Sequence, residues 1–168
     1  GGLYAAIASL EKIDVKGLVL INTLRKPSPR LDWINRAMVN AAKLGGSALI
    51  MDMGMPVIAS PKFLNKVKSN ALVFENYKPL DKNDGIFKLM EGSLSANWSF
   101  DWSKINVPTL IMTGHLDKMF RIPEDIEDLI KKIKNPITLE LPSCGHLIPL
   151  EEPEQFSNHI IKFAKNLN

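Results

Sequence analysis

Residues 141–153 have the sequence Leu-Pro-Ser-Cys-Gly-His-Leu-Ile-Pro-Leu-Glu-Glu-Pro, the stretch that is most informative about the fold. A glycine-flanked histidine, His146, is followed by an apolar turn and then by two glutamates and a proline. Gly145 permits backbone conformations that other residues disfavour, and Pro153 suits the first turn of a helix. The pattern predicts a strand-to-helix loop that presents an imidazole, which is where a catalytic base would be held.

Regular patterns flank this loop on both sides. Residues 137–141 alternate apolar and polar side chains and stop at Pro142, as a strand does. After the loop, apolar residues share one helical face, namely Phe156, Ile160, Phe163, Ala164 and Leu167. We therefore expect a strand, the histidine loop and a helix in that order.

A second loop of the same kind lies upstream. Residues 107–113 form an apolar run typical of a buried parallel strand, and Gly-His-Leu-Asp ends it at 114–117. A helical pattern that begins at Pro123 separates the two loops. With a right-handed crossover the two strands lie side by side, and both loops open at the same edge. Asp117 could then orient His146 through one ring nitrogen and leave the other to act as base.

These two loops resemble the acid loop and the histidine loop of the α/β-hydrolase fold superfamily. The matching segments are Val-Pro-Thr-Leu-Ile-Met-Thr-Gly-His-Leu-Asp (107–117) and Cys-Gly-His-Leu-Ile-Pro-Leu-Glu-Glu-Pro-Glu-Gln-Phe (144–156). The resemblance implies an α/β fold with a mainly parallel sheet flanked by helices. It also implies a catalytic triad with Asp117 as the acid and His146 as the base.

The start of the chain extends the resemblance and leaves a gap. In the family a helix begins at the nucleophile elbow, G-x-S-x-G, and here a helical pattern follows Gly1-Gly2. If Gly1 is the last glycine of that elbow, the nucleophile lies two residues before it. The nucleophile and the N-terminal strands of the sheet are then expected outside this sequence, as a partner segment of the same hydrolase. An ordinary turn or a tag remnant is the alternative for Gly1-Gly2.

The predicted organisation is a core interrupted by an insertion. Residues 1–24 and 101–168 carry the strand–helix alternation of the core, whereas residues 25–100 contain apolar helical stretches. In the family, an insertion at this place forms a helical cap, or lid. Methionine adapts to varied shapes, so part of the insertion is expected to line an apolar substrate pocket, with packing of the cap against the sheet as the alternative. The residues assigned to this pocket are Met51, Met53, Met55 and Phe87.

The remaining histidines and the cysteine are assigned no chemistry. His115 is expected to be a solvated loop residue, His159 a surface residue, and Cys144 a small buried side chain and not a nucleophile. The three histidines lack paired metal-ligand spacing, and no glycine-rich phosphate loop occurs. We therefore predict neither a metal nor a cofactor.

Charge, hydropathy and cysteine content indicate which binding partners and compartment to expect. The net charge is +3, and the 21 lysines and arginines are spread along the chain, which gives no nucleic-acid or polybasic membrane signature. No apolar run is long enough to span a bilayer. A single cysteine excludes an intramolecular disulfide and favours the cytoplasm.

Taken together, the resemblance implies the C-terminal portion of a serine hydrolase that acts on small apolar carboxylic esters, as esterases and lipase-like enzymes do. An aspartate nucleophile, as in haloalkane dehalogenases and epoxide hydrolases of the same fold, is an alternative. A binding protein that keeps the fold without catalysis is another. The identity of the nucleophile stays open.

Overall fold

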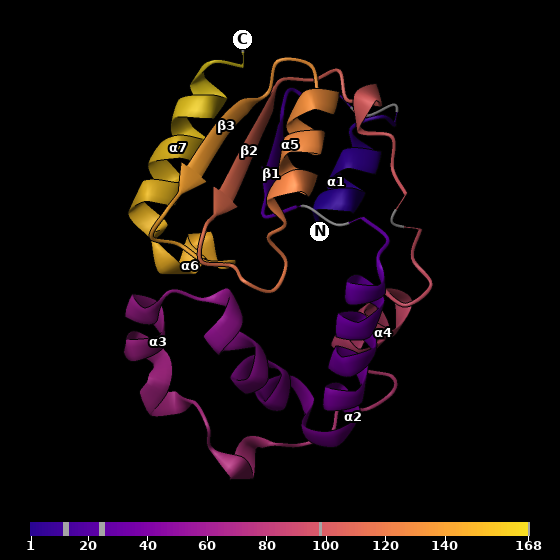
Figure 1. Cartoon of the computed structure of the whole chain (residues 1–168), viewed down its shortest axis with the longest axis vertical. Helices are drawn as coiled ribbons and strands as arrows, with labels where there is room; N and C mark the ends of the chain where they lie inside the picture. The colour runs from indigo at the N-terminus through magenta and orange to yellow at the C-terminus, as the bar shows by residue number, and fades with distance from the viewer. Residues whose placement is uncertain (12–13, 24–25, 98, 168) are drawn as a thin grey trace. The chain divides into compact units, whose positions relative to one another are not determined.

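The computed structural model describes residues 1–11, 14–23, 26–97 and 99–167. The chain divides into two compact units, whose elements are labelled in Figure 1. Unit 1 comprises Gly1–Arg25, Val57–Ser60 and Phe100–Asn168, and unit 2 comprises Lys26–Pro56 and Pro61–Ser99. The sequence-based division placed all of residues 25–100 in the insertion, whereas in the structure residues 57–60 belong to unit 1.

Unit 1 is built on a parallel sheet. Among the described residues its strands are β1 (Leu18–Ile21), β2 (Thr109–Gly114) and β3 (Ile137–Leu141), in that spatial order. Leu20 is paired with Ile111, and Ile111 with Thr138. The predicted α/β class with parallel strands is confirmed. Because the strands are parallel, their carboxyl ends meet at one edge, where the loops that contain Asp117 and His146 begin (Figure 1).

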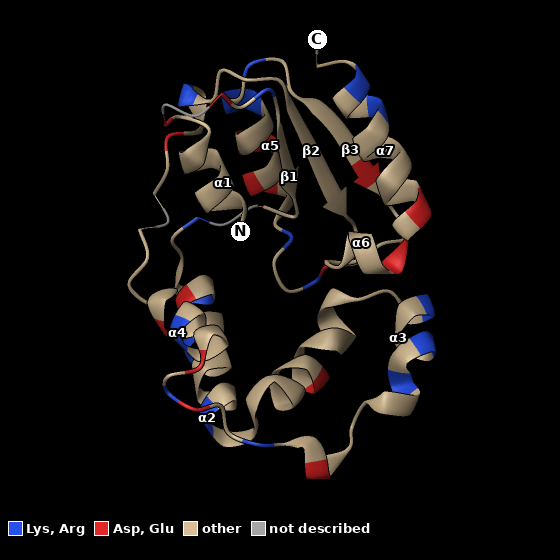
Figure 2. Cartoon of the chain, turned by 180° about the vertical axis from the view of Figure 1, so that it is seen from behind, with Lys and Arg blue, Asp and Glu red and all other residues tan. Residues whose placement is uncertain are grey.

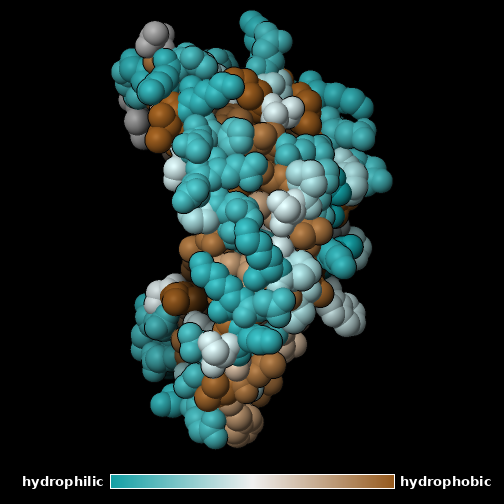
Figure 3. Space-filling view, turned by 90° about the vertical axis from the view of Figure 1, so that its left-hand side faces the viewer, coloured by the Kyte–Doolittle hydropathy of each residue, from teal (hydrophilic) through white to brown (hydrophobic). Residues whose placement is uncertain are grey.

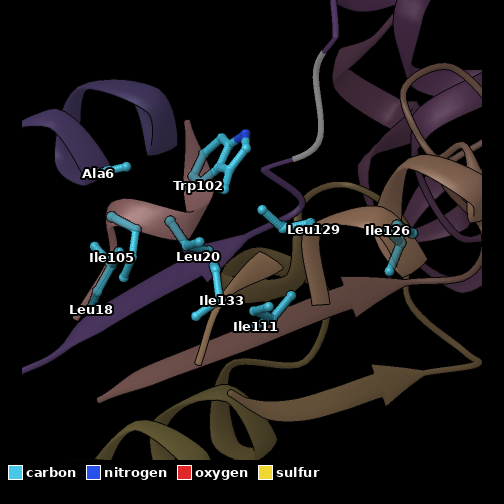
Figure 4. Packing of buried hydrophobic residues seen from close by; sticks show 9 residues of the cluster. All are labelled: Ala6, Leu18, Leu20, Trp102, Ile105, Ile111, Ile126, Leu129 and Ile133. Carbon is cyan, nitrogen blue, oxygen red and sulfur yellow. The ribbon is translucent and has the colours of Figure 1, made fainter. Parts of the chain in front are cut away.

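Helices cover both faces of this sheet. On one face, α1 (Gly2–Ala8), the short 3-10 helix η3 (Trp102–Lys104) and α5 (Pro123–Lys132) pack against β1 and β2. Figure 4 shows this half of the core, which consists of Ala6, Leu18, Leu20, Trp102, Ile105, Ile111, Ile126, Leu129 and Ile133. Alternation along the strands turns the neighbouring side chains to the other face.

The second half of the core lies beneath α6 (Ile148–Glu151) and α7 (Pro153–Lys165). Its buried members are Leu110, Met112, Leu141, Cys144, Ile148 and Phe163. Helix α7 has Glu154 in its first turn and Lys162 and Lys165 in its last, and Figure 2 shows this separation of acidic and basic ends. Both placements suit the helix dipole. The histidine loop is therefore followed directly by two helices whose apolar side chains pack in the core.

Unit 2 is mainly helical. Its longest element, α2 (Pro29–Ile58), ends within unit 1 and is followed by α3 (Pro61–Val67). Two 3-10 turns, η1 (Lys68–Asn70) and η2 (Phe74–Asn76), lead to α4 (Gly85–Gly92). Helix α2 is kinked at Gly46, whose φ of 66° is favourable for glycine and strained for other residues.

Asp52 joins two segments of unit 2 that are distant in sequence. Its carboxylate accepts hydrogen bonds from the hydroxyl of Tyr77 (2.9 Å) and the backbone N–H of Leu72 (2.9 Å). The hydrogen bond to Asp52 raises the pKa of the Tyr77 hydroxyl, because it favours the protonated phenol. This carboxylate therefore ties the irregular residues after α3 to α2.

The surface carries apolar patches among hydrophilic side chains, as Figure 3 shows for one face. The most exposed large apolar side chains, all in unit 2, are Trp33, Leu44, Leu72 and Phe74. Within the described part of the chain, no helix combines the length and the apolar character that a bilayer crossing requires.

Candidate active site

Asp117 follows β2, and its own neighbours fix its carboxylate. Oδ1 accepts hydrogen bonds from the backbone N–H groups of Met119 (3.1 Å) and Phe120 (2.9 Å), so the loop turns around this side chain. The side chain is only 1% exposed. A carboxylate that is buried and held through one oxygen presents the other, Oδ2, in a fixed direction.

That direction leads to His146. The ring atom Nδ1 of His146 lies 2.6 Å from Oδ2 of Asp117, and the histidine side chain is 26% exposed. The ring of Phe120 packs against the imidazole with 5.0 Å between ring centroids. The structure thus brings together the two residues to which the sequence assigned acid and base roles. We call this pair the dyad.

The geometry of the dyad suits proton transfer at the second ring nitrogen. When Nδ1–H donates to Asp117, Nε2 carries the lone pair that can accept a proton. The carboxylate also stabilises the imidazolium that forms when Nε2 is protonated. A histidine that is partly exposed and oriented by a buried carboxylate can therefore act as a general base and then as a general acid.

Asn22, immediately after β1, connects three segments at the same sheet edge, a role that was not predicted from the sequence. Its Oδ1 accepts from the N–H of Gly114 (2.9 Å), at the end of β2. Its Nδ2 donates to the carbonyl oxygens of His146 (2.8 Å) and Gly145 (3.3 Å). The φ of Asn22 is 47°, a conformation that asparagine tolerates better than most residues. Its one sequence signal is its position after a strand.

Residues 57–60, which we call the bridging segment, contact both loops of the dyad. The carbonyl of Val57 accepts from the N–H of Lys118 (2.8 Å), and the carbonyl of Ile58 accepts from the N–H of His146 (2.6 Å). Gly145 allows this approach, because a Cβ at that position would lie 2.0 Å from the Ile58 oxygen. The bridging segment therefore holds the acid loop and the histidine loop through one backbone hydrogen bond to each.

Glu151, the first of the two glutamates before Pro153, contributes to the histidine loop. It is the last residue of α6, is 7% exposed, and its carboxylate turns back into the histidine loop. There it accepts backbone hydrogen bonds from residues on both sides of His146. A glutamate in a Glu-Glu-Pro sequence gives no local signal of this role.

The other residues singled out from sequence lie apart from the dyad. His115 pairs through Nε2 with Glu140, and both side chains are substantially exposed. His159 is half-buried on α7, and Cys144 is fully buried in the core. Among the described residues, no group of three or more His, Cys, Asp or Glu side chains is placed to hold a metal ion.

The residues assigned to an apolar pocket divide into two sets. Met51 and Met53 are 44% and 63% exposed, whereas Met55 and Phe87 are buried. Phe87 also has the Lys43 ammonium 5.9 Å from its ring centroid, within unit 2. Their assignment to a substrate pocket stays a prediction.

Comparison with known proteins gives relatives at the level of sequence and of fold. No protein-family model matches the chain. The uncharacterized hydrolase YugF of Bacillus subtilis (strain 168) is 32% identical over 114 residues, which cover 61% of this chain and 40% of that protein.

Solved structures share the fold over nearly the whole chain. MGS-M2, an alpha/beta hydrolase enzyme from a Medee basin deep-sea metagenome library, has a TM-score of 0.79 and 24% identity over 96% of this chain and 62% of its own. The enol-lactonase from Burkholderia xenovorans LB400 has a TM-score of 0.75 and 18% identity over 98% and 62%. A thermophilic esterase from Thermogutta terrifontis has a TM-score of 0.70 and 22% identity over 90% and 56%. The chain thus spans less than two thirds of these relatives.

Proposed function

Because the chain has the α/β-hydrolase fold, we propose that it is the part of a serine hydrolase that supplies the acid and the base for cleavage of carboxylic esters. The observation that carries the proposal is the hydrogen bond between His146 Nδ1 and the buried carboxylate of Asp117, at 2.6 Å. An esterase and an enol-lactonase among the structural neighbours support the ester class.

The proposed reaction proceeds in two halves. A serine hydroxyl attacks the ester carbonyl carbon while Nε2 of His146 takes the hydroxyl proton, and Asp117 stabilises the imidazolium. The tetrahedral intermediate then expels the alcohol, which receives the proton from Nε2. Water repeats the sequence on the acyl-enzyme, releases the carboxylic acid and restores the serine.

The nucleophile in this proposal belongs to a segment that precedes Gly1. Helix α1 supports that placement, because its first residue, Gly2, lies against the side chain of Thr23, just after the end of β1. A side chain shortly before Gly1 would therefore enter at the carboxyl edge of the sheet, where the dyad lies. Small apolar esters are the proposed substrates.

A fluorophosphonate probe, which reacts with activated serines, tests the proposal on the purified protein together with any chain that co-purifies. We expect covalent labelling, located by intact mass and peptide mapping on a serine upstream of Gly1, and loss of labelling in the His146→Ala variant. His159→Ala is the matched histidine control and should label normally.

Other outcomes distinguish the alternatives. Failure to label, combined with turnover of haloalkanes or epoxides, would assign an aspartate nucleophile. Absence of both labelling and turnover in the protein with all its chains present would contradict the enzymatic proposal and favour a binding protein.

A further inference from the structure

Glu151 is a buried carboxylate whose partners lie on both sides of His146 in the sequence. Oε1 accepts hydrogen bonds from the N–H groups of Gly145 (3.1 Å) and Leu147 (3.1 Å). Oε2 accepts from Gly145 (3.0 Å) and from the N–H of Ser60 (2.8 Å), at the end of the bridging segment. One side chain therefore collects backbone donors from the residue before the histidine, the residue after it, and a third segment.

The chemistry of this cluster is complementary. Every partner of the carboxylate is an N–H donor, and an ionised carboxylate is an acceptor only. Burial of a charged group is costly unless hydrogen bonds replace its water, and charge-assisted bonds to backbone N–H groups are stronger than neutral ones. The arrangement therefore favours a carboxylate over a neutral polar side chain at this position.

We propose that Glu151 is a positioning residue for the dyad, an inference that rests on the proposed function. It acts through the backbone, because it fixes the peptide groups on either side of His146 and leaves the imidazole free to bond Asp117. The His146 N–H donates in turn to Ile58 of the bridging segment, which Glu151 holds through Ser60.

The same cluster links the two loops of the dyad. The bridging segment accepts from Lys118, next to Asp117, at its first residue and donates to Glu151 at its last. Displacement of the Glu151 carboxylate would therefore alter the position of the histidine loop relative to the acid loop. A misplacement of about 1 Å at a reacting group can cost on the order of 10²-fold in rate.

The variant Glu151→Gln tests this role, because glutamine has nearly the same shape but presents an NH₂ group to one set of N–H donors. We expect kcat for a small ester to fall roughly 10- to 100-fold with KM little changed. We also expect the low-field proton NMR signal of the His146 Nδ1–H to shift or broaden, because its hydrogen bond to Asp117 is distorted. Glu154→Gln, an equal change of charge at an exposed position on α7, is the matched control.

A purely structural role predicts a different result. In that case Glu151→Gln would lower the melting temperature but leave kcat and the Nδ1–H signal of the folded protein as in the wild type, and the proposal would be overturned. If Glu151→Gln does not fold, Glu151→Asp carries the same comparison, since its carboxylate keeps the charge but is too short to reach all three donors. The NMR signal requires no turnover, so it tests the positioning role even if the protein proves not to hydrolyse esters.

Discussion

The two residues of the dyad are positioned in different ways. The carboxylate of Asp117 is held locally, because it accepts hydrogen bonds from residues two and three positions further along, although the backbone of its loop also bonds Val57 through Lys118. The histidine loop is held by residues outside it. Asn22 donates to its carbonyl oxygens, Ile58 accepts from the N–H of His146, and Glu151, only four to six positions further along, accepts from the N–H groups of Leu147 and Gly145. The acid side chain is thus oriented by its own turn, whereas the backbone around the base is held by residues outside its loop, two of them remote in sequence.

Because of this difference, substitutions in the two loops should have different effects on stability and rate. A change at Asp117 that keeps its Oδ1 acceptor should preserve the turn and affect chemistry alone. A change in the partners of the histidine loop should affect both folding stability and rate, because those contacts also join separate parts of unit 1. The variants below test this separation, from the largest expected effect to the smallest.

Asp117→Asn should produce the largest loss. The asparagine oxygen can still accept from Met119 and Phe120, but the side chain no longer holds the Nδ1–H tautomer or stabilises the imidazolium. We expect kcat for an ester to fall about 10⁴-fold, as for the orienting aspartate of a serine protease, with little change in urea stability. The control is Glu124→Gln, which removes one exposed carboxylate from α5. A large loss of stability alongside the rate would show that the asparagine does not preserve the turn around position 117.

Gly145→Ala should reduce both rate and stability. The added Cβ would lie 2.0 Å from the Ile58 carbonyl oxygen, so the histidine loop and the bridging segment must separate. We expect a loss of about 1–3 kcal/mol in the free energy of unfolding from overpacking, measured in urea. We also expect a fall in kcat of roughly 10-fold or more from misplacement of His146. Gly92→Ala, where an added Cβ meets open space in α4, is the control and should not destabilise. Wild-type behaviour of Gly145→Ala would contradict the close approach.

Asn22→Asp should produce a smaller loss, mainly in stability. Aspartate matches asparagine in shape and in its tolerance of positive φ, but it places a carboxylate oxygen against the carbonyl oxygens of Gly145 and His146. Loss of these donors in a buried site should cost about 1–3 kcal/mol in the free energy of unfolding. Asn40→Asp on the exposed face of α2 makes the same chemical change as a control. If the two variants are equally stable, the hydrogen bonds of Asn22 do not contribute to holding the histidine loop.

His115→Gln should have the smallest effect. Its pairing with Glu140 is a second histidine–carboxylate contact on the same sheet, but its members are 32% and 53% exposed. Exposed contacts of this kind contribute at most about 1 kcal/mol, so we expect kcat within about twofold of wild type and a small change in melting temperature. A loss of rate comparable with that of Asp117→Asn would mean that burial does not distinguish the two pairs.

The elements of unit 1 could be predicted from sequence because their signals are local. The alternating residues 137–141 form β3 over those same bounds, and Pro123 and Pro153 begin α5 and α7 as their positions suggested. Parallel pairing of β2 with β3 then requires the loops that follow them to share one edge, so the proximity of Asp117 and His146 could be argued before any coordinates.

The supports of the histidine loop could not be predicted, because most of them join residues that are remote in sequence. Ser60 and Glu151 are separated by 91 positions, and Asn22 lies 124 positions from His146. Glu151 also follows a common local pattern, an acidic residue before a helix-starting proline, which by itself is typical of an interaction with the helix end. No periodicity or motif identifies a carboxylate that binds backbone N–H groups from three separate positions.

The bridging segment limits how this protein can be recombined. Residues 57–60 belong to unit 1, yet they are encoded between two stretches of unit 2. A chimera that exchanges residues 26–99 as one block would replace the carbonyl that accepts from the His146 N–H and the N–H that donates to Glu151. An exchange that keeps 57–60 and replaces only the stretches before and after it would preserve both contacts. Crossover sites at Pro56 and Pro61 are therefore the boundaries at which unit 2 can be exchanged while both contacts are kept.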